Sequence, residues 1–269
     1  MGAYRIERDF LGEMEIPADA YYGIHTHRAV KNFPISPFRV PREFIQALAE
    51  VKEACTLANI HANLLDSKIG EAITEAAREV QNGKFSDQFI VDAFQGGAGT
   101  STNMNMNEVL ANRAIEILGG IKGDYHLVDP LEHVNLSQST NDVYPTALKV
   151  AAIRLVITLS EVIALLQGAF QEKESTFAGI LKLGRTEMQD AVPMTLGQEF
   201  GAYAEAFARD RWRLFKVEER LRQVNLGGTA IGTGLNAERE YIYAAVEELQ
   251  NITGLGIAGG QKLKQRKRG

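Results

Sequence analysis

The stretch that decides the fold runs from Pro145 to Lys173 and reads PTALKVAAIRLVITLSEVIALLQGAFQEK. Its apolar residues recur at intervals of three or four positions, which is the pattern of an amphipathic α-helix. At about 1.5 Å per residue such a helix is roughly 40 Å long. Lys149, Arg154 and Glu161 interrupt the apolar run, and each is costly in hydrocarbon. We therefore expect a helix of a bundle and no membrane span.

The residues on either side of this stretch predict further helices. Apolar side chains recur at helical spacing in segments 41–58, 67–82, 195–224 and 238–252, and Gly83 and Gly254 stand where two of them should end. Residues 1 to about 40 carry prolines and scattered glycines instead, so an extended arm with turns is expected there. The long helices have wide apolar faces, and we expect partner chains to complete the bundle.

The composition is that of an ordinary soluble protein. The chain has 269 residues, 45% of them hydrophobic, and a net charge of −5, so it can bury a substantial core. Mild acidity argues against nucleic acid as a partner, although the last eight residues carry five Lys or Arg. The single cysteine, Cys55, cannot form an intrachain disulfide and lies in an apolar-periodic stretch, which predicts a core residue. No signal-peptide pattern is present, so a cytoplasmic location is expected.

Three clusters of polar residues lie at or near the starts of predicted helices. They span 96–108, before a helix expected over 109–118, then 135–142 and 184–195. The second has six neutral hydrogen-bonding residues among eight. Helix caps and turns account for each cluster taken alone. Together they offer hydroxyl and amide donors with few fixed charges, which suits proton removal next to a carboxylate, because such donors stabilise the extra negative charge.

Other kinds of site find less support in the sequence. The five histidines, at 25, 27, 61, 126 and 133, have none of the spacings typical of metalloproteases or zinc sites. The glycine-rich run 96–99 lacks the Gly-Lys-Ser/Thr ending of a P-loop. It also lacks the strand-glycine-helix context of a dinucleotide site. In the third cluster, Arg185 is expected to pair with Asp190 or Glu187 as a structural brace.

The three clusters closely resemble the aspartase/fumarase superfamily, and within it the aspartases more than the class II fumarases. The resemblance covers roughly residues 4–255 and includes the arm. It is carried by GAGTSTNMN at 97–105, by SQSTNDVYP at 137–145, by the third cluster and by AYYGIHT at 20–26.

The resemblance implies a mainly α fold, with a small N-terminal domain followed by an incomplete central long-helix bundle. The expected divisions are 1–141 for the N-terminal domain, 142–254 for the partial bundle and 255–269 for a divergent basic tail. It further implies a homotetramer whose active sites each draw on three chains, and no cofactor. The small-molecule substrate would be L-aspartate, reversibly deaminated to fumarate and ammonia through Cβ proton abstraction and an aci-carboxylate.

Site residues follow from the same resemblance. Thr100, Ser139 and Thr140 would hold the β-carboxylate of the substrate. Asn141, Thr186 and the residue after it would surround its amino group. That residue is Glu187 here, whereas the family commonly has His or Gln. An ionised Glu187 would attract a substrate ammonium, which favours an amine substrate over malate.

A second departure concerns the catalytic base. The family's base serine and second carboxylate-binding lysine lie in a loop of pattern Gly-Ser-Ser-x-Met-Pro-x-Lys-x-Asn-Pro, which does not occur in these 269 residues. We therefore expect a chain truncated before that loop, with no catalytic residue of its own and without activity alone. The alternatives are a fumarase-like carboxylate lyase and a non-catalytic helical assembly partner of the superfamily.

Overall fold

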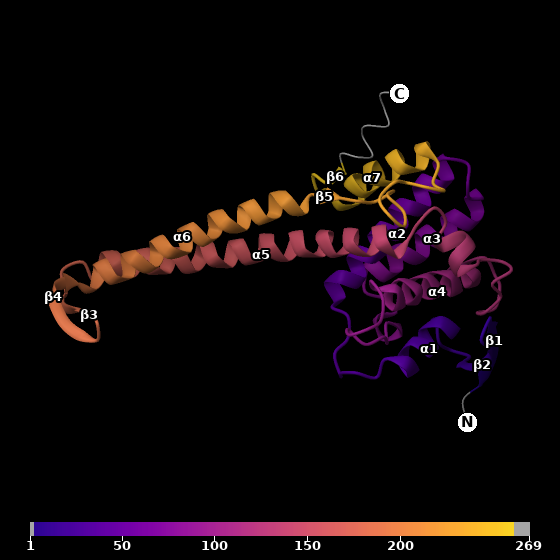
Figure 1. Ribbon diagram of the computed structural model, residues 1–269, viewed down its shortest axis with the longest axis horizontal. Coiled ribbons are helices and arrows are strands. Elements are labelled where there is room, and N and C mark those ends of the chain that lie inside the picture. Colours follow the sequence, from indigo (N-terminus) through magenta and orange to yellow (C-terminus); the bar gives the residue numbers. More distant parts are fainter. Residues whose placement is uncertain (1–2, 261–269) are drawn as a thin grey trace. The chain divides into compact units, whose positions relative to one another are not determined.

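The computed structural model describes residues 3–260 and is mainly α-helical, as predicted (Figure 1). Within these residues, every sheet has two strands. The helices are α1 (Ile24–Asn32), α2 (Arg42–His61), α3 (Ser67–Gln81), α4 (Thr100–Ile117), α5 (Thr140–Thr176), α6 (Leu196–Leu221) and α7 (Arg239–Thr253), with short turns η1 (Ser86–Gln88) and η2 (Pro130–Val134). The strands are β1 (Tyr4–Asp9), β2 (Gly12–Pro17), β3 (Leu181–Thr186), β4 (Gln189–Thr195), β5 (Gln223–Val224) and β6 (Ala258–Gly259).

Contacts divide the chain into two compact units. Among the described residues, the first unit comprises 3–151 and 222–260, and the second comprises 152–221. This division differs from the one expected at 141/142 and 254/255. Helix α7 packs against α2 in the first unit, because its apolar face meets the long buried helix of the N-terminal part.

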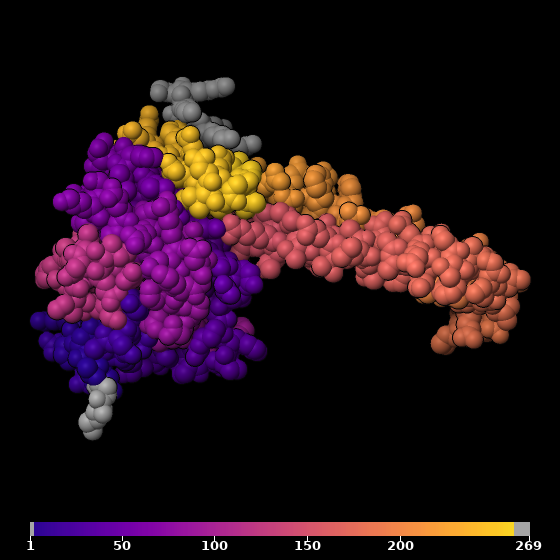
Figure 2. All heavy atoms as spheres, turned by 180° about the vertical axis from the view of Figure 1, so that it is seen from behind, coloured from indigo at the N-terminus to yellow at the C-terminus, as the bar shows by residue number. Residues whose placement is uncertain are grey.

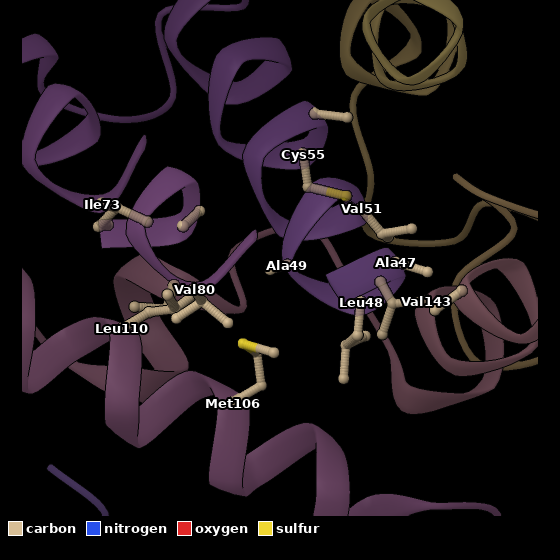
Figure 3. Packing of buried hydrophobic residues seen from close by; sticks show 14 of the residues in the cluster. Ala47, Leu48, Ala49, Val51, Cys55, Ile73, Val80, Met106, Leu110 and Val143 are labelled. Carbon is tan, nitrogen blue, oxygen red and sulfur yellow. The ribbon is translucent and has the colours of Figure 1, made fainter. Parts of the chain in front are cut away.

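The core of the first unit is built around α2. Its side chains at Leu48, Val51 and Cys55 are fully buried, and α3, α4 and α7 pack around the helix. Ile73 of α3 and Met106 of α4 lie in the same cluster (Figure 3). Cys55 is thus a core residue, as predicted, and burial raises the pKa of its thiol to about 12.

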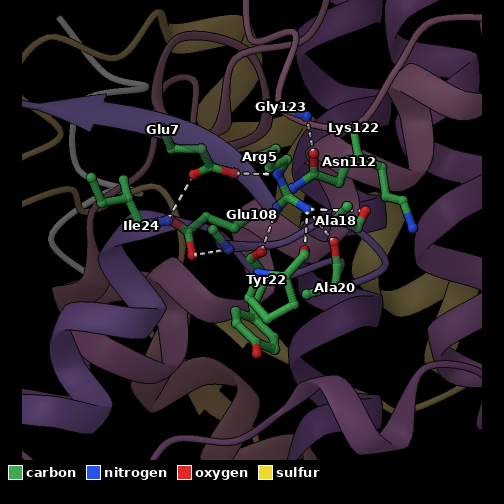
Figure 4. Close-up of polar contacts among 12 residues, drawn as sticks. Arg5, Glu7, Ala18, Ala20, Tyr22, Ile24, Glu108, Asn112, Lys122 and Gly123 are labelled. Carbon is green, nitrogen blue, oxygen red and sulfur yellow. Dashed lines mark hydrogen bonds and ion pairs between the residues drawn. The ribbon is translucent and has the colours of Figure 1, made fainter. Parts of the chain in front are cut away.

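The expectation of an irregular arm over residues 1–40 was wrong. Strands β1 and β2 form an antiparallel hairpin, and α1 follows it. The guanidinium of Arg5 donates to the carbonyl of Pro17 at 3.0 Å. It also donates to the carbonyls of Ala20 and Tyr22 at 2.8 and 2.7 Å (Figure 4). Prolines suggested a loop, but Pro17 ends β2 and the later prolines follow α1, so they separate regular elements rather than exclude them.

Two buried carboxylates hold the start of α1, which has no side-chain cap of its own. Glu108 of α4 accepts from the backbone nitrogens of Gly23, His25 and Thr26 at 2.8–3.1 Å. Glu7 of β1 accepts from Ile24 N at 2.8 Å (Figure 4). Burial raises the pKa of Glu108. The first polar cluster therefore ends in a structural residue.

Two helices begin earlier than the sequence suggested. Helix α4 begins at Thr100, not at 109, so most of the first polar cluster is helical. Helix α5 begins at Thr140, ahead of Pro145. Because proline has no N–H, the carbonyl of Asn141 is left open one turn back, and the side-chain amide of Asn225 donates to it at 2.9 Å. Tertiary contacts thus extend both helices towards their N-termini.

The second unit contains the rest of α5, the hairpin β3–β4 and α6. The third polar cluster, 184–195, lies in this hairpin. Its two turn residues, Glu187 and Met188, have φ of 49° and 61°, as the turns favoured in two-residue hairpins require. Phe170 of α5 stacks on Phe207 of α6 with ring centroids 5.4 Å apart.

Large apolar side chains of the second unit remain exposed within the chain. On α5 and α6 they include Leu165 (76% exposed) and Trp212 (65%), and α5 side chains are seen at the surface in Figure 2. By length and composition alone, α5 is the one helix of residues 3–260 that could cross a membrane. Core helices of soluble proteins pass the same test, and α5 carries the three charges noted above, so the absence of a span stays a prediction.

Candidate carboxylate site at two helix starts

The glycine run before α4 lies directly against α5. Gly97 and Gly99 have φ of 71° and 88°, a region in which side chains are strained. A Cβ on Gly99 would lie 2.3 Å from ring carbons of Tyr144, so only glycine permits this approach. Thr100 is the exposed first residue of α4, at a helix N-terminus whose dipole favours anions.

The second cluster forms the start of α5. The hydroxyl of Ser139 accepts from Asn141 N at 3.2 Å, and Asp142 Oδ1 accepts from Ser139 N at 2.9 Å. Side chains at both ends of this turn therefore accept backbone N–H groups, and together they cap the start of α5. Thr140 Oγ1 accepts from Asn103 Nδ2 of α4 at 3.1 Å. The structure therefore joins the starts of α4 and α5, which carry Thr100, Ser139, Thr140 and Asn141.

The partly buried amide of Asn135 and the buried amine of Lys52 support these helix starts from behind. Asn135 Oδ1 accepts from Asn103 and Asn107 of α4 at 3.1–3.2 Å. Lys52 Nζ of α2 donates to Asn135 Oδ1 at 2.9 Å and to Gln138 Oε1 at 2.8 Å. The Lys52 side chain is fully buried, and desolvation lowers its pKa to about 7.

Sequence reasoning missed this support. The signal was a lysine inside the apolar-periodic segment 41–58, next to core position Val51. A long basic side chain beside a core position is rarely buried without a polar partner.

A loop that the sequence reading did not select completes the site. It follows α6 and contains the glycine-rich run GGTAIGTG at 227–234. Asn141 Nδ2 donates to Ala230 O at 2.8 Å, and Asp142 Oδ2 accepts from the backbone nitrogens of Gly227 and Thr229. The loop therefore lies on the N-terminal turn of α5. Its glycine content was the available signal.

Two clefts flank the start of α5. One, of about 440 Å³, is lined by residues of the glycine run together with Asn141 and Tyr144. The other, of about 550 Å³, is lined by Ser137, Ser139 and residues of the 229–236 loop. Both are open, and both sides of the α5 N-terminus are therefore accessible to a small ligand.

Thr186 and Glu187 belong to the second unit. Thr186 ends β3, and both side chains are exposed. The predicted brace is present, since Arg185 Nε lies 3.2 Å from Asp190 Oδ1. Four of the six predicted site residues are thus joined in the first unit, and the roles given to all six stay predictions. Over residues 3–260 no group of three or more His, Cys, Asp or Glu side chains is arranged to hold a metal ion.

Comparisons with known proteins agree with the motifs at these helix starts. Residues 12–267 match the family model described as Lyase, a range that runs past Gly254. The chain is 52% identical over 259 residues to aspartate ammonia-lyase of Bacillus sp, covering 96% of this chain and 55% of that protein. The Escherichia coli (strain K12) aspartate ammonia-lyase is 49% identical over 262 residues, with 96% and 55% covered. The chain thus spans about half the length of the curated relatives it matches.

Solved structures give the same result for the fold. A structure of fumarate lyase:delta crystallin from Brucella melitensis bound to cobalt has a TM-score of 0.94 and 46% identity, covering 98% of this chain and 58% of that one. Recombinant class II fumarase from Schistosoma mansoni has a TM-score of 0.88 and 33% identity, covering 94% and 53%. With its joined helix starts and these motifs, the chain belongs to the Lyase family, within the aspartase/fumarase superfamily.

Proposed function

We propose that this chain supplies the part of an aspartate ammonia-lyase site that holds one carboxylate and the amino group of L-aspartate. The observation that carries the proposal is the junction of the α4 and α5 N-termini through the Asn103–Thr140 hydrogen bond. Two helix N-termini and three neutral hydroxyls at Thr100, Ser139 and Thr140 favour a carboxylate. Identities of 49–52% to aspartate ammonia-lyases support the substrate class.

The proposed chemistry is removal of a Cβ proton followed by loss of ammonia. As the proton leaves, negative charge moves onto the bound carboxylate and forms an aci-carboxylate. The hydroxyls of Ser139 and Thr140 and the helix dipoles stabilise that charge, since they are oriented before the reaction begins. Asn141, held by Ala230 O, would lie beside the amino group. Thr186 and Glu187 would reach the same group from another copy of a homotetramer.

The proton-abstracting group is not among the residues placed here. The family's serine loop does not occur in these 269 residues, so we propose that a polypeptide of this sequence alone forms no fumarate from L-aspartate. Formation of fumarate at an enzyme-like rate by that polypeptide would contradict this part of the proposal.

Binding tests the carboxylate site without requiring turnover. Fumarate added to the isotopically labelled chain should shift the amide resonances of Thr100 and of residues 139–141. Thr140→Val removes the hydroxyl at nearly constant shape and should weaken fumarate binding about tenfold, because a hydrogen bond to a charged group contributes roughly 1.5 kcal/mol or more. Thr158→Val, at an exposed α5 hydroxyl that bonds to Arg154 O, is the matched control. Equal affinity for both variants would contradict the assignment.

A fumarase-like lyase is the second candidate, because a class II fumarase also matches at 33% identity over 94% of the chain. The charge of Glu187 separates the two. An ionised Glu187 favours an ammonium group over a hydroxyl, so Glu187→Gln in the assembled enzyme should reduce turnover of L-aspartate and not of L-malate. Unchanged aspartate turnover would remove Glu187 from the proposal, and turnover of malate alone would favour the fumarase-like function.

A further inference from the structure

Asp142 is a buried residue of the second polar cluster, and the proposed function gives it no role. Its side chain is completely buried, and burial raises the pKa of its carboxyl. It accepts three backbone N–H groups: Ser139 N on Oδ1 at 2.9 Å, and Gly227 N and Thr229 N on Oδ2 at 3.2 and 3.0 Å. A buried carboxylate is costly unless its hydrogen bonds are satisfied, so these bonds decide where the two segments lie.

The two oxygens bind two different parts of the site. Oδ1 completes the cap of α5, beside Ser139 and Thr140. Oδ2 holds the loop at Gly227 and Thr229, whose φ values of 81° and 55° turn the chain back over the helix start. The next residues of this loop, 229–231, and then residues 235 and 236 line one side of the 550 Å³ cleft, and Ser139 lines the other.

The surroundings of Asp142 show that it acts through the backbone. Lys52 is near enough to favour the ionised carboxyl, but its Nζ donates to Asn135 and Gln138. The side chains of Asn141 and Asn225 add two bonds between helix start and loop, from Asn141 Nδ2 to Ala230 O and from Asn225 Nδ2 to Asn141 O. Asn141 is thus held by the same loop that Asp142 holds.

We propose that Asp142 is a positioning residue that holds the Gly227–Asn236 loop against the start of α5, and thereby sets the width of the cleft beside Ser139 and the direction of Asn141. The effect of Asp142 on fumarate binding rests on the proposed function, whereas the link between the start of α5 and the Gly227–Asn236 loop does not. Fumarate should bind tightly only while this link is intact.

Hydrogen exchange and fumarate affinity, measured on the whole chain, test the proposal. Asp142→Asn retains one acceptor oxygen and presents an NH2 group to the other set of backbone N–H groups. Exchange at Gly227 and Thr229 should become at least tenfold faster, and fumarate affinity should fall at least tenfold. Asp142→Glu should keep α5 protected, because Glu at this position still reaches Ser139 N, but should loosen the loop and weaken binding.

Asp66→Asn is the matched control. Asp66 accepts from the backbone nitrogens of Lys68 and Ile69 at the start of α3 and lines neither cleft. It should lower thermal stability without changing loop exchange or fumarate affinity. Unchanged exchange at Gly227 and Thr229 in Asp142→Asn would overturn the link. Faster exchange with unchanged affinity would reduce Asp142 to a stabilising residue and overturn its positioning role.

A measurement on the unmodified chain still tests the proposal if the Asp142 variants do not fold. The amide protons of Gly227 and Thr229 should be protected and should shift when the Asp142 carboxyl, followed by its ¹³C resonance, is titrated with acid. Exchange at unstructured-loop rates in the unmodified chain would overturn the link. Absence of any fumarate binding by that chain would refute the proposed carboxylate site, while the exchange data would still decide whether Asp142 holds the loop.

Discussion

Gly23, at the start of α1, lies where a side chain would have no room. A Cβ there would lie 2.4 Å from Tyr125 Oη, 2.7 Å from Glu7 Oε2 and 2.8 Å from Glu108 Oε1. All three are polar atoms held by other hydrogen bonds around this helix start. The absence of a side chain at Gly23 therefore lets two carboxylates approach the backbone.

Gly23→Ala should destabilise the protein by about 1–3 kcal/mol, because overpacking displaces groups that cannot move without losing hydrogen bonds. Chemical denaturation measures the loss. Gly179→Ala is the control, since its Cβ would meet nothing within 4 Å, and it should change stability by less than about 0.5 kcal/mol. If both substitutions changed the free energy of unfolding equally, the carboxylates of Glu7 and Glu108 would be able to move aside without loss of stability.

Lys52 gives the protein a stability that depends on pH. Its pKa is lowered from 10.5 to about 7 in the folded state, so between these values the unfolded chain binds more protons and stability rises with pH. The slope should be at most about 1.4 kcal/mol per pH unit. The useful window is pH 7 to 8.5, because the raised pKa of Cys55 acts in the opposite direction near and above its ordinary value of 9.0.

Lys52→Met should remove this slope, since it replaces the amine by an apolar group of similar size. The measurement is the free energy of unfolding of both proteins at several pH values in that window. A difference between the two that stays constant with pH would show that Lys52 remains charged in the folded protein.

At the scale of elements, two glycines of α6 that lie one turn apart, Gly197 and Gly201, both lie close to Glu174 of α5. A Cβ on Gly197 would lie 2.5 Å from the backbone carbonyl of Glu174 and 2.8 Å from Ala178 Cα. A Cβ on Gly201 would meet only side-chain atoms of Glu174, the nearest at 2.5 Å. The first contact is with backbone and the second with the end of a flexible side chain.

Gly197→Ala should therefore destabilise the second unit by about 1–3 kcal/mol, as overpacking does. Gly201→Ala should be neutral or slightly stabilising, because alanine favours a helix by up to about 1 kcal/mol over glycine. Thermal unfolding followed by helical circular dichroism compares the pair. If Gly201→Ala were the less stable of the two variants, the backbone contact at Gly197 would not be what limits the approach of the two helices.

For the whole molecule, the exposed apolar face of the second unit predicts self-association. Val162 and Leu165 on α5 and Phe215 on α6 are 56–76% exposed, and a patch of such residues is typical of an interaction surface. In line with the proposed homotetramer, sedimentation velocity should show oligomers. Leu165→Glu should shift them to smaller species, whereas Ile121→Glu, at a residue 82% exposed in the first unit, should not.

If the protein sedimented as a monomer at a protein concentration of tens of micromolar, the proposed self-association would be contradicted. Mixing with a full-length aspartate ammonia-lyase distinguishes the non-catalytic partner from the enzyme. Mixed tetramers with reduced activity would favour the partner function, and mixed tetramers that keep full activity would favour the proposed share of a catalytic site.

Local signals were enough to locate several elements. Segment 67–82 is helical over Ser67–Gln81, and α7 ends at Thr253 with Gly254 as its cap, whose φ of 67° is the left-handed conformation expected of a terminating glycine. These features depend on residues a few positions apart in the sequence, and hydrophobic periodicity and helix caps are patterns of that length. The family motifs at 97–105 and 137–145 are equally local, so the sequence by itself determined these two helix ends, the positions of the longest helices and the family.

Contacts between distant residues decided the rest. Lys52 bonds to Asn135 and Gln138, 83 and 86 positions away, and Asp142 bonds to Gly227 and Thr229, 85 and 87 positions away. No local pattern encodes such pairs. They form because a buried charge or amide must find hydrogen-bond partners wherever the folded chain places them. Only the tertiary structure therefore revealed that the helix starts are held from behind by Lys52 and against a glycine-rich loop by Asp142.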